Sequence, residues 1–239
     1  MDEASWLAST DPTAMLTFLR TGGQATPRKL RLFGCACCRR IWHLLEERAK
    51  AGVSSIEQFT DGLLGQQEFE SAGRWVGNEL TSQVLAMRGG VVICATTAVV
   101  RFFIPDITEV PDLLMGTVAD GAWFASSAAG VGNANQPDAL EQQAQAKLLR
   151  DIFGTPFRPL PPINLSLLTW NGGLIRTLAQ AAYDDRLLPS GQLDPARLGV
   201  LADALTDAGC TDAELLEHLR GEGPHLRGCY AVDCILGKS

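Results

Sequence analysis

Residues 28–40, RKLRLFGCACCRR, place five basic residues and three cysteines in thirteen positions. Pro27 stands directly before this stretch and favours the first turn of a helix. On such a helix the cysteines fall on the same side as Leu30 and Phe33, where thiols pack as small apolar groups. We therefore predict a helix over residues 27–50 with the cysteines in its apolar face. The opposite, basic face contains Lys29, Arg39 and Arg40.

Helix signals of the same kind recur along the chain. Asp-Pro pairs at 11–12 and 194–195 combine an N-cap with a first-turn proline, and residues 211–214, TDAE, form a capping box. Apolar spacing predicts helices over residues 27–50, 56–64, 66–87, 113–129 and 139–153, and further helices that begin near Asn171, Pro195, Thr211 and Pro224. Residues 91–104 are β-branched, but we expect a buried helix there because no second convincing strand accompanies them.

These signals predict an all-α fold, a multi-helix array with a proline-rich crossover and a small C-terminal helical group. The crossover is residues 154–164, GTPFRPLPPIN, whose four prolines favour extended chain. It separates an N-terminal helical region, 1–153, from a C-terminal one, 165–239. The two regions could also pack as one domain.

The composition argues against several classes of protein. A chain of 239 residues can bury a core without disulfides or metals, and its net charge of −7 argues against a surface built throughout for phosphate backbones. Seven cysteines, an odd number, are atypical of a secreted disulfide protein, so we expect a cytoplasmic protein. The longest apolar run, 91–104, has 14 residues and contains Arg101, which is too short and too polar for a membrane span.

Several stretches resemble a heavily paralogous bacterial family. They include WLASTDPTAMLTFLR (6–20), CACCRRIW (35–42), LADALTDAGC (201–210) and the HLRGC tail (225–229). The resemblance covers both ends of the chain and is weak over residues 55–140. It implies a helical, cytoplasmic protein and no known activity.

Cysteine and histidine residues near the C-terminus form a candidate metal site. His225, Cys229 and Asp233 are spaced i, i+4 and i+8, and a His/Cys pair at i, i+4 on one helix can hold zinc. Cys210 and His218 could complete a tetrahedron if the short helices fold back. The alternative is that these residues pack in the core, and we expect no other cofactor.

The basic face of residues 28–40 offers a different hypothesis. Lys29, Arg39 and Arg40 could contact an anionic partner or nucleic acid. The alternative is an ordinary solvated helix face, because no aromatic or glycine-rich phosphate motif accompanies it. A whole-chain excess of acidic residues also disfavours nucleic acid.

Recognised catalytic motifs are absent from the sequence: no phosphate-binding loop, dinucleotide fingerprint, HExxH or GxSxG is present. The leading expectation is therefore a non-enzymatic helical scaffold or protein-interaction module. Its alternatives are a metal- or thiol-dependent protein that uses the C-terminal Cys/His residues, and an anion or nucleic-acid binder. The sequence leaves the partner and the oligomeric state open.

Overall fold

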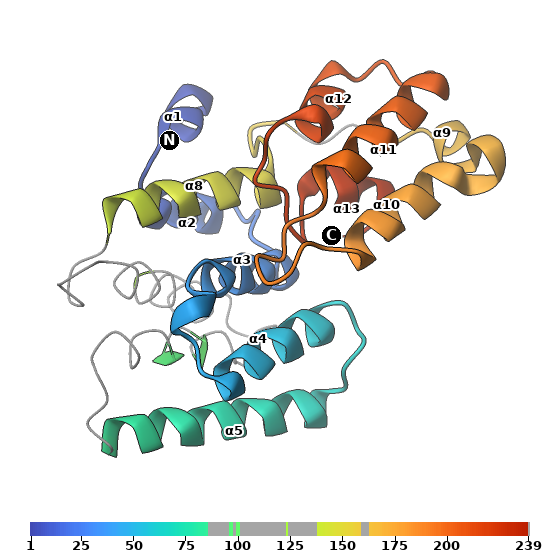
Figure 1. Ribbon diagram of the computed structural model, residues 1–239. Coiled ribbons are helices and arrows are strands. Elements are labelled where there is room, and N and C mark those ends of the chain that lie inside the picture. Colours follow the sequence, from blue (N-terminus) through green and yellow to red (C-terminus); the bar gives the residue numbers. More distant parts are fainter. Residues whose placement is uncertain (86–95, 98, 101–122, 124–137, 159–162, 239) are drawn as a thin grey trace. The chain divides into compact units, whose positions relative to one another are not determined.

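The computed structural model describes residues 1–85, 96–97, 99–100, 123, 138–158 and 163–238 (Figure 1). These residues form helices joined by loops, and extended pairing among them is confined to isolated bridges between Leu187 and Gln192 and between Gln192 and Leu226. The predicted all-α class is thereby confirmed. The expectations for residues 101–122, 124–137 and 159–162, and most of those for 91–104, lie outside the described residues.

The chain folds into two compact units, residues 1–149 and 150–239. Their boundary falls within one helix, α8, four residues before the end of the N-terminal region predicted from sequence. The described helices of the first unit are α1 (Glu3–Ala8), α2 (Pro12–Thr21), α3 (Pro27–Arg40), η1 (Trp42–Leu44), α4 (Glu47–Thr60), α5 (Gln66–Leu85) and most of α8 (Ala139–Phe153).

Helix α3 is the buried centre of the first unit. Every residue from Leu30 to Arg39 is buried, so the helix has no solvated basic face between these positions. The guanidinium of Arg31 lies over the rings of Phe59 and Phe69, 5.1 and 5.7 Å from their centroids. The predicted separation into an apolar and a basic face is therefore wrong, because the arginines have aromatic and acidic partners inside the unit.

The cysteines of α3 pack in the core, as predicted. Cys35, Cys37 and Cys38 are each at most 1% exposed. Burial raises the pKa of Cys37 and of Cys38 above the ordinary thiol value. Thiols of this kind are unreactive and pack as apolar groups.

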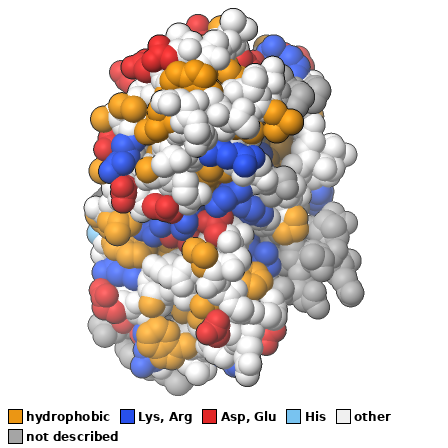
Figure 2. Space-filling model, turned by 90° about the vertical axis from the view of Figure 1, so that its right-hand side faces the viewer, with side chains coloured by type: hydrophobic (Ala, Val, Ile, Leu, Met, Phe, Trp, Pro, Cys, Tyr) orange, Lys and Arg blue, Asp and Glu red, His pale blue; other side chains and the backbone are white. Residues whose placement is uncertain are grey.

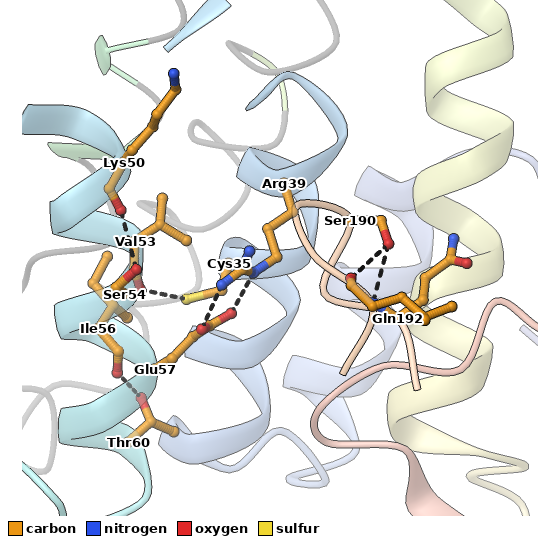
Figure 3. Close-up of polar contacts among 11 residues, drawn as sticks. Cys35, Arg39, Lys50, Val53, Ser54, Ile56, Glu57, Thr60, Ser190 and Gln192 are labelled. Atoms are coloured by element: carbon orange, nitrogen blue, oxygen red, sulfur yellow. Dashed lines mark hydrogen bonds and ion pairs between the residues drawn. The ribbon is translucent and has the colours of Figure 1, made fainter. Parts of the chain in front are cut away.

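The helix predicted over 27–50 is interrupted. Ile41 leaves the helical conformation (φ −101°, ψ 22°), η1 follows, and α4 begins at Glu47 rather than near residue 56. The interruption lets the Arg39 side chain reach both Trp42, whose ring centroid is 5.0 Å away, and Glu57 on α4 (Figure 3). Tertiary contacts therefore end α3, since residues 41–46 contain no glycine or proline.

Among its described residues, the second unit contains the end of α8 and six further helical segments. They are α9 (Leu165–Thr169), η2 (Trp170–Gly173), α10 (Leu174–Asp184), α11 (Pro195–Asp207), α12 (Ala213–Arg220) and α13 (Tyr230–Leu236). Helices α10, α11 and α13 bury Tyr183, Leu201 and Val232 in a common core, which α12 covers with Leu215 and Leu219. Asp194 and Asp212 cap α11 and α12 through their side chains.

Two predicted helix starts in this unit are wrong. Asn171 has a positive φ of 47° within η2, and α10 begins after Gly173 without a side-chain cap. Pro224 begins no helix: residues 221–229 form a loop, and the last helix starts at Tyr230. His225 and Cys229 therefore lie in a loop and not at helical spacing.

Candidate metal site

Four side chains of metal-binding type converge in the second unit: Asp151, His218, His225 and Cys229. Asp151 lies in the last turn of α8, and His218 lies in α12. His225 and Cys229 come from residues 221–229, which connect α12 to α13 and which we call the metal loop. The group therefore joins the end of α8 to α12 and the loop directly after it, and Asp151 is 74 residues from His225 in the sequence.

The ligand atoms of these residues are spaced as a single ion requires. His218 Nε2 lies 3.2 Å from Asp151 Oδ1 and 3.2 Å from Cys229 Sγ. His225 Nδ1 lies 3.2 Å from the same Asp151 oxygen. All four ligand atoms lie within 4.8 Å of one another. Tetrahedral zinc, with bonds of about 2.0–2.3 Å, holds its ligand atoms about 3.3–3.8 Å apart, so small side-chain shifts suffice to enclose it.

Atoms that face away from the centre have their own hydrogen-bond partners. His225 Nε2 lies 3.1 Å from the Gly221 carbonyl oxygen, and donation to that oxygen leaves the Nδ1 lone pair facing the other ligands. The Leu226 N–H donates to Asp151 Oδ2 at 2.9 Å, which leaves Oδ1 for the centre. Hydrogen bonds of this kind orient the ligands of known metal sites.

Burial makes this group costly without a compensating charge. Asp151, His225 and Cys229 are 3%, 4% and 0% exposed, whereas the His218 side chain is 20% exposed. Buried carboxylates and imidazoles require hydrogen bonds or a charged partner. His218 is the member of the group with the largest exposed fraction.

Two groups in the cluster have shifted pKa values. Burial raises the pKa of Cys229 well above the ordinary thiol value, the negative charge of Asp151 raises it further, and the N–H groups of Val232 and Ala231 oppose the shift. Burial lowers the pKa of His225, but the hydrogen bond and charge of Asp151 more than reverse this, so the net shift is upward. A divalent cation would favour the thiolate and the neutral imidazole instead.

Aromatic packing fixes the position of His218. Its ring lies 4.7 Å from that of His225, edge to face, and 4.4 Å from that of Tyr230, measured between centroids. Tyr230 also packs against the backbone of Gly154, where a Cβ atom would lie 3.0 Å from the tyrosine Cγ. Tyr230 and Gly154 therefore support the ligand from outside the group.

The arrangement does not fit a nucleophilic triad. In a Cys–His–Asp triad the thiol and the carboxylate contact opposite nitrogens of the imidazole. Here Cys229 Sγ and Asp151 Oδ1 both lie 3.2 Å from Nε2 of His218. A metal ion needs ligand atoms that converge on one point. A proton relay instead needs the imidazole to lie between the thiol and the carboxylate.

The structure brings together three of the four residues that the sequence suggested as ligands. His218, His225 and Cys229 belong to the group, but Cys210 does not, and it lines a separate surface pocket of about 270 Å³. Asp233, which shares their sequence spacing, accepts a hydrogen bond from the Tyr183 hydroxyl. The i, i+4 helical geometry was the wrong reason for pairing His225 with Cys229, since a loop joins them.

Asp151 takes the place expected for Cys210. It is 74 residues from His225 in the sequence, so no local spacing connects the two. One signal was available: Asp151 lies three residues after Leu148 and directly before Ile152, on the side of α8 that is buried. An acidic residue on an apolar helix face needs a partner.

The predicted basic face does not form a common surface. Arg39 is 6% exposed and paired with Glu57, with Nε–Oε1 at 2.6 Å and Nη2–Oε2 at 2.8 Å. Arg40 Nε lies 2.8 Å from Glu141 Oε2, and Lys29 is half-buried. On the face drawn in Figure 2, basic and acidic side chains are interspersed. The burial of Arg39 contradicts the solvated basic face expected from sequence, whereas the Arg40 side chain is 40% exposed beside Glu141.

Comparison with known proteins gives no further guide to function. The chain matches no protein-family model, no curated protein and no solved structure. None of the helices that the structure describes has the length and apolar character needed to span a bilayer.

Proposed function

We propose that residues 150–239 form a zinc-binding module in which Asp151, His218, His225 and Cys229 are the ligands. The observation that carries this proposal is the placement of four ligand atoms, from three chain segments, within 4.8 Å of one another. The competing explanation is a hydrogen-bonded Asp–His cluster that needs no ion. The two explanations differ in one measurable quantity, the metal content.

The ligand types favour zinc over other common ions. One carboxylate oxygen, two imidazole nitrogens and one thiolate form a mixed set that suits zinc, whereas calcium and magnesium prefer oxygen alone. The charges also balance, because one carboxylate and one thiolate neutralise a divalent ion and both imidazoles are neutral. A neutral assembly is the form that a site with three buried ligands tolerates best.

The number of ligands favours a structural role. Catalytic zinc sites keep one position for water or substrate, whereas structural sites use four protein ligands. A zinc ion here would connect the end of α8, α12 and the metal loop. The thiolate ligand requires reduced Cys229, which agrees with the cytoplasmic location expected from sequence. The scaffold or interaction role predicted from sequence stays a prediction, and a zinc-stabilised helical module could perform it.

Metal analysis of the full chain tests the proposal. Protein purified without a histidine tag should contain about one zinc per chain, and the variants Cys229→Ser and His218→Ala should contain much less. Cys210→Ser is the matched control, since it removes a half-buried cysteine of the same unit outside the group; it should retain the zinc of the wild type.

Cobalt substitution adds a test of geometry. Cobalt in place of zinc should give visible bands typical of tetrahedral coordination and a thiolate-to-metal band that disappears in Cys229→Ser and persists in Cys210→Ser. Wild-type protein that neither contains zinc nor takes up zinc or cobalt after removal of bound metal would leave the hydrogen-bonded cluster as the explanation.

A further inference from the structure

A second loop of the same unit is attached to the metal loop by its backbone. Residues 187–192, which we call the hairpin loop, connect α10 to α11. The loop is closed by two hydrogen bonds, from the Leu187 N–H to the Gln192 carbonyl and from the Gly191 N–H to the Leu187 carbonyl, both 2.8 Å. Ser190 Oγ accepts a hydrogen bond from the Gln192 N–H at 3.3 Å (Figure 3). The loop therefore has a defined shape of its own.

The attachment runs through a proposed ligand. The Leu193 N–H donates to the carbonyl oxygen of His225 at 2.8 Å, and Gln192 forms a bridge with Leu226. Leu226 in turn donates its N–H to Asp151 Oδ2. The backbone of residues 225–226 is thus held on one side by the hairpin loop and on the other by the ligand group.

The outer end of the hairpin loop is apolar and exposed. Leu187 is 45% exposed and Leu188 is 72% exposed, whereas Leu193, at the base of the loop, is 1% exposed. Neighbouring large apolar side chains at a surface are the type of feature that proteins present to other molecules. Both leucines extend from the base of the hairpin loop. The metal loop holds that base through the hydrogen bond between Leu193 and His225.

We propose that zinc binding strengthens the attachment of the hairpin loop to residues 225–226 and so fixes the position of Leu187 and Leu188. This inference rests on the proposed zinc site. Without the ion, the metal loop is held by its hydrogen bonds and by the packing of Leu226 and Cys229. With the ion bound to His225, residues 225–226 can open only when the ion is released. The hydrogen bond between Leu193 and His225 therefore becomes harder to break.

Hydrogen exchange of the full chain, measured on metal-free protein and with zinc, tests the coupling. At a free zinc concentration 100 times the Kd, exchange that requires metal-loop opening should slow by up to about 100-fold. We expect this slowing in peptides that cover residues 187–193 and 225–229. Amides of α11 that exchange only on global unfolding should also slow, because zinc stabilises the folded chain, so the coupling is tested on the exchange of residues 187–193 that does not depend on denaturant.

The variant Asp151→Asn separates loss of zinc binding from loss of the hydrogen bond to the Leu226 N–H. It removes the ligand charge but keeps an oxygen that can accept from the Leu226 N–H, so the variant should fold and lose the zinc response in both loops. Cys210→Ser should respond like the wild type.

Zinc content measured on the same samples separates the two proposals. If one zinc binds and slows exchange in residues 225–229 but not in 187–193, the coupling is wrong and the zinc site stands. Slowing in residues 187–193 that is confined to the denaturant-dependent exchange, as in α11, overturns the coupling in favour of global stabilisation. If no zinc binds, both proposals fail.

Discussion

At the scale of single residues, Gly154 supports the ligand group without belonging to it. Its φ of 63° is in the left-handed region, and a Cβ atom there would lie 3.0–3.2 Å from three ring atoms of Tyr230. Gly209 has a φ of 91° but no atom within 4 Å of its ideal Cβ position. The pair therefore separates the effect of backbone conformation from that of contact with Tyr230.

Alanine substitutions at these two glycines should have different consequences. Gly209→Ala should lower the free energy of unfolding by about 1–2 kcal/mol, since only the left-handed conformation is penalised. Gly154→Ala should cost about 1–3 kcal/mol more, because the new methyl group displaces Tyr230. Urea unfolding measures both changes.

Zinc affinity provides a second readout for the same variants. Tyr230 contacts the ring of His218, so Gly154→Ala should weaken zinc binding while Gly209→Ala leaves it unchanged. Equal zinc affinities in the two variants would show that Tyr230 does not position the ligand.

At the scale of elements, a buried ion pair joins α3 to α4. Arg39 and Glu57 have side chains that are each 5% exposed, and two hydrogen bonds connect them. Removing one member leaves the other charge buried without its partner, which typically costs about 3–5 kcal/mol. Arg39→Met should therefore destabilise the protein by about this amount in urea unfolding.

The double variant Arg39→Met/Glu57→Leu controls for the charge left behind. It should be more stable than Arg39→Met alone, because no unpaired charge remains. Lys50→Met removes an ion pair whose partner, Glu47, is 90% exposed, and it should change stability by at most about 1 kcal/mol. A double variant as unstable as the single one would assign the loss to packing rather than to charge.

Helix α8 carries a carboxylate with an upward pKa shift. Burial raises the pKa of Glu141 above its ordinary value of 4.5, and the charge and hydrogen bond of Arg40 only partly offset this. Because the folded state binds the proton more tightly, stability should fall as the pH rises from 4.5 to the folded-state pKa. Comparing Glu141→Gln with the wild type isolates this contribution: the stability difference should change in this window and be constant above it.

Helix boundaries show which elements local sequence determines. Asp11 with Pro12 and Asp194 with Pro195 start helices where predicted, because the N-cap oxygen and the fixed proline φ act within one turn. The end of α3 and the start of α13 were predicted wrongly. Arg39 reaches Glu57 and Trp42 only after the chain turns at Ile41, and no local pattern encodes those partners.

At the scale of the whole molecule, the candidate site was partly predictable by residue type and not by geometry. Histidine and cysteine near the C-terminus identified His218, His225 and Cys229, because few other side chains bind zinc. Asp151 could not be identified in the same way, since its partners lie on distant segments and acidic residues are common. Cys210 was chosen for its type and lies elsewhere because α11 and α12 place it beside a surface pocket.

The linkage between zinc and folding gives the last prediction. An ion that binds the folded chain at one site, and the unfolded chain weakly, should raise the free energy of unfolding by about 1.4 kcal/mol for each tenfold increase in free zinc above the Kd. Urea unfolding at buffered zinc concentrations, followed by helical circular dichroism, measures this slope for the full chain. Cys229→Ser should abolish the slope, and Cys210→Ser should keep it.

The dependence of the free energy of unfolding on free zinc distinguishes this site from nonspecific binding. Zinc captured by surface side chains outside the group would act equally on Cys229→Ser, and His43, the one histidine of the sequence outside the group, provides a further control. His43→Gln should retain the full slope because it removes no ligand. A wild-type slope of zero, with stoichiometric zinc bound, would mean that the ion binds the unfolded chain equally well, and the structural role of the site would then be wrong.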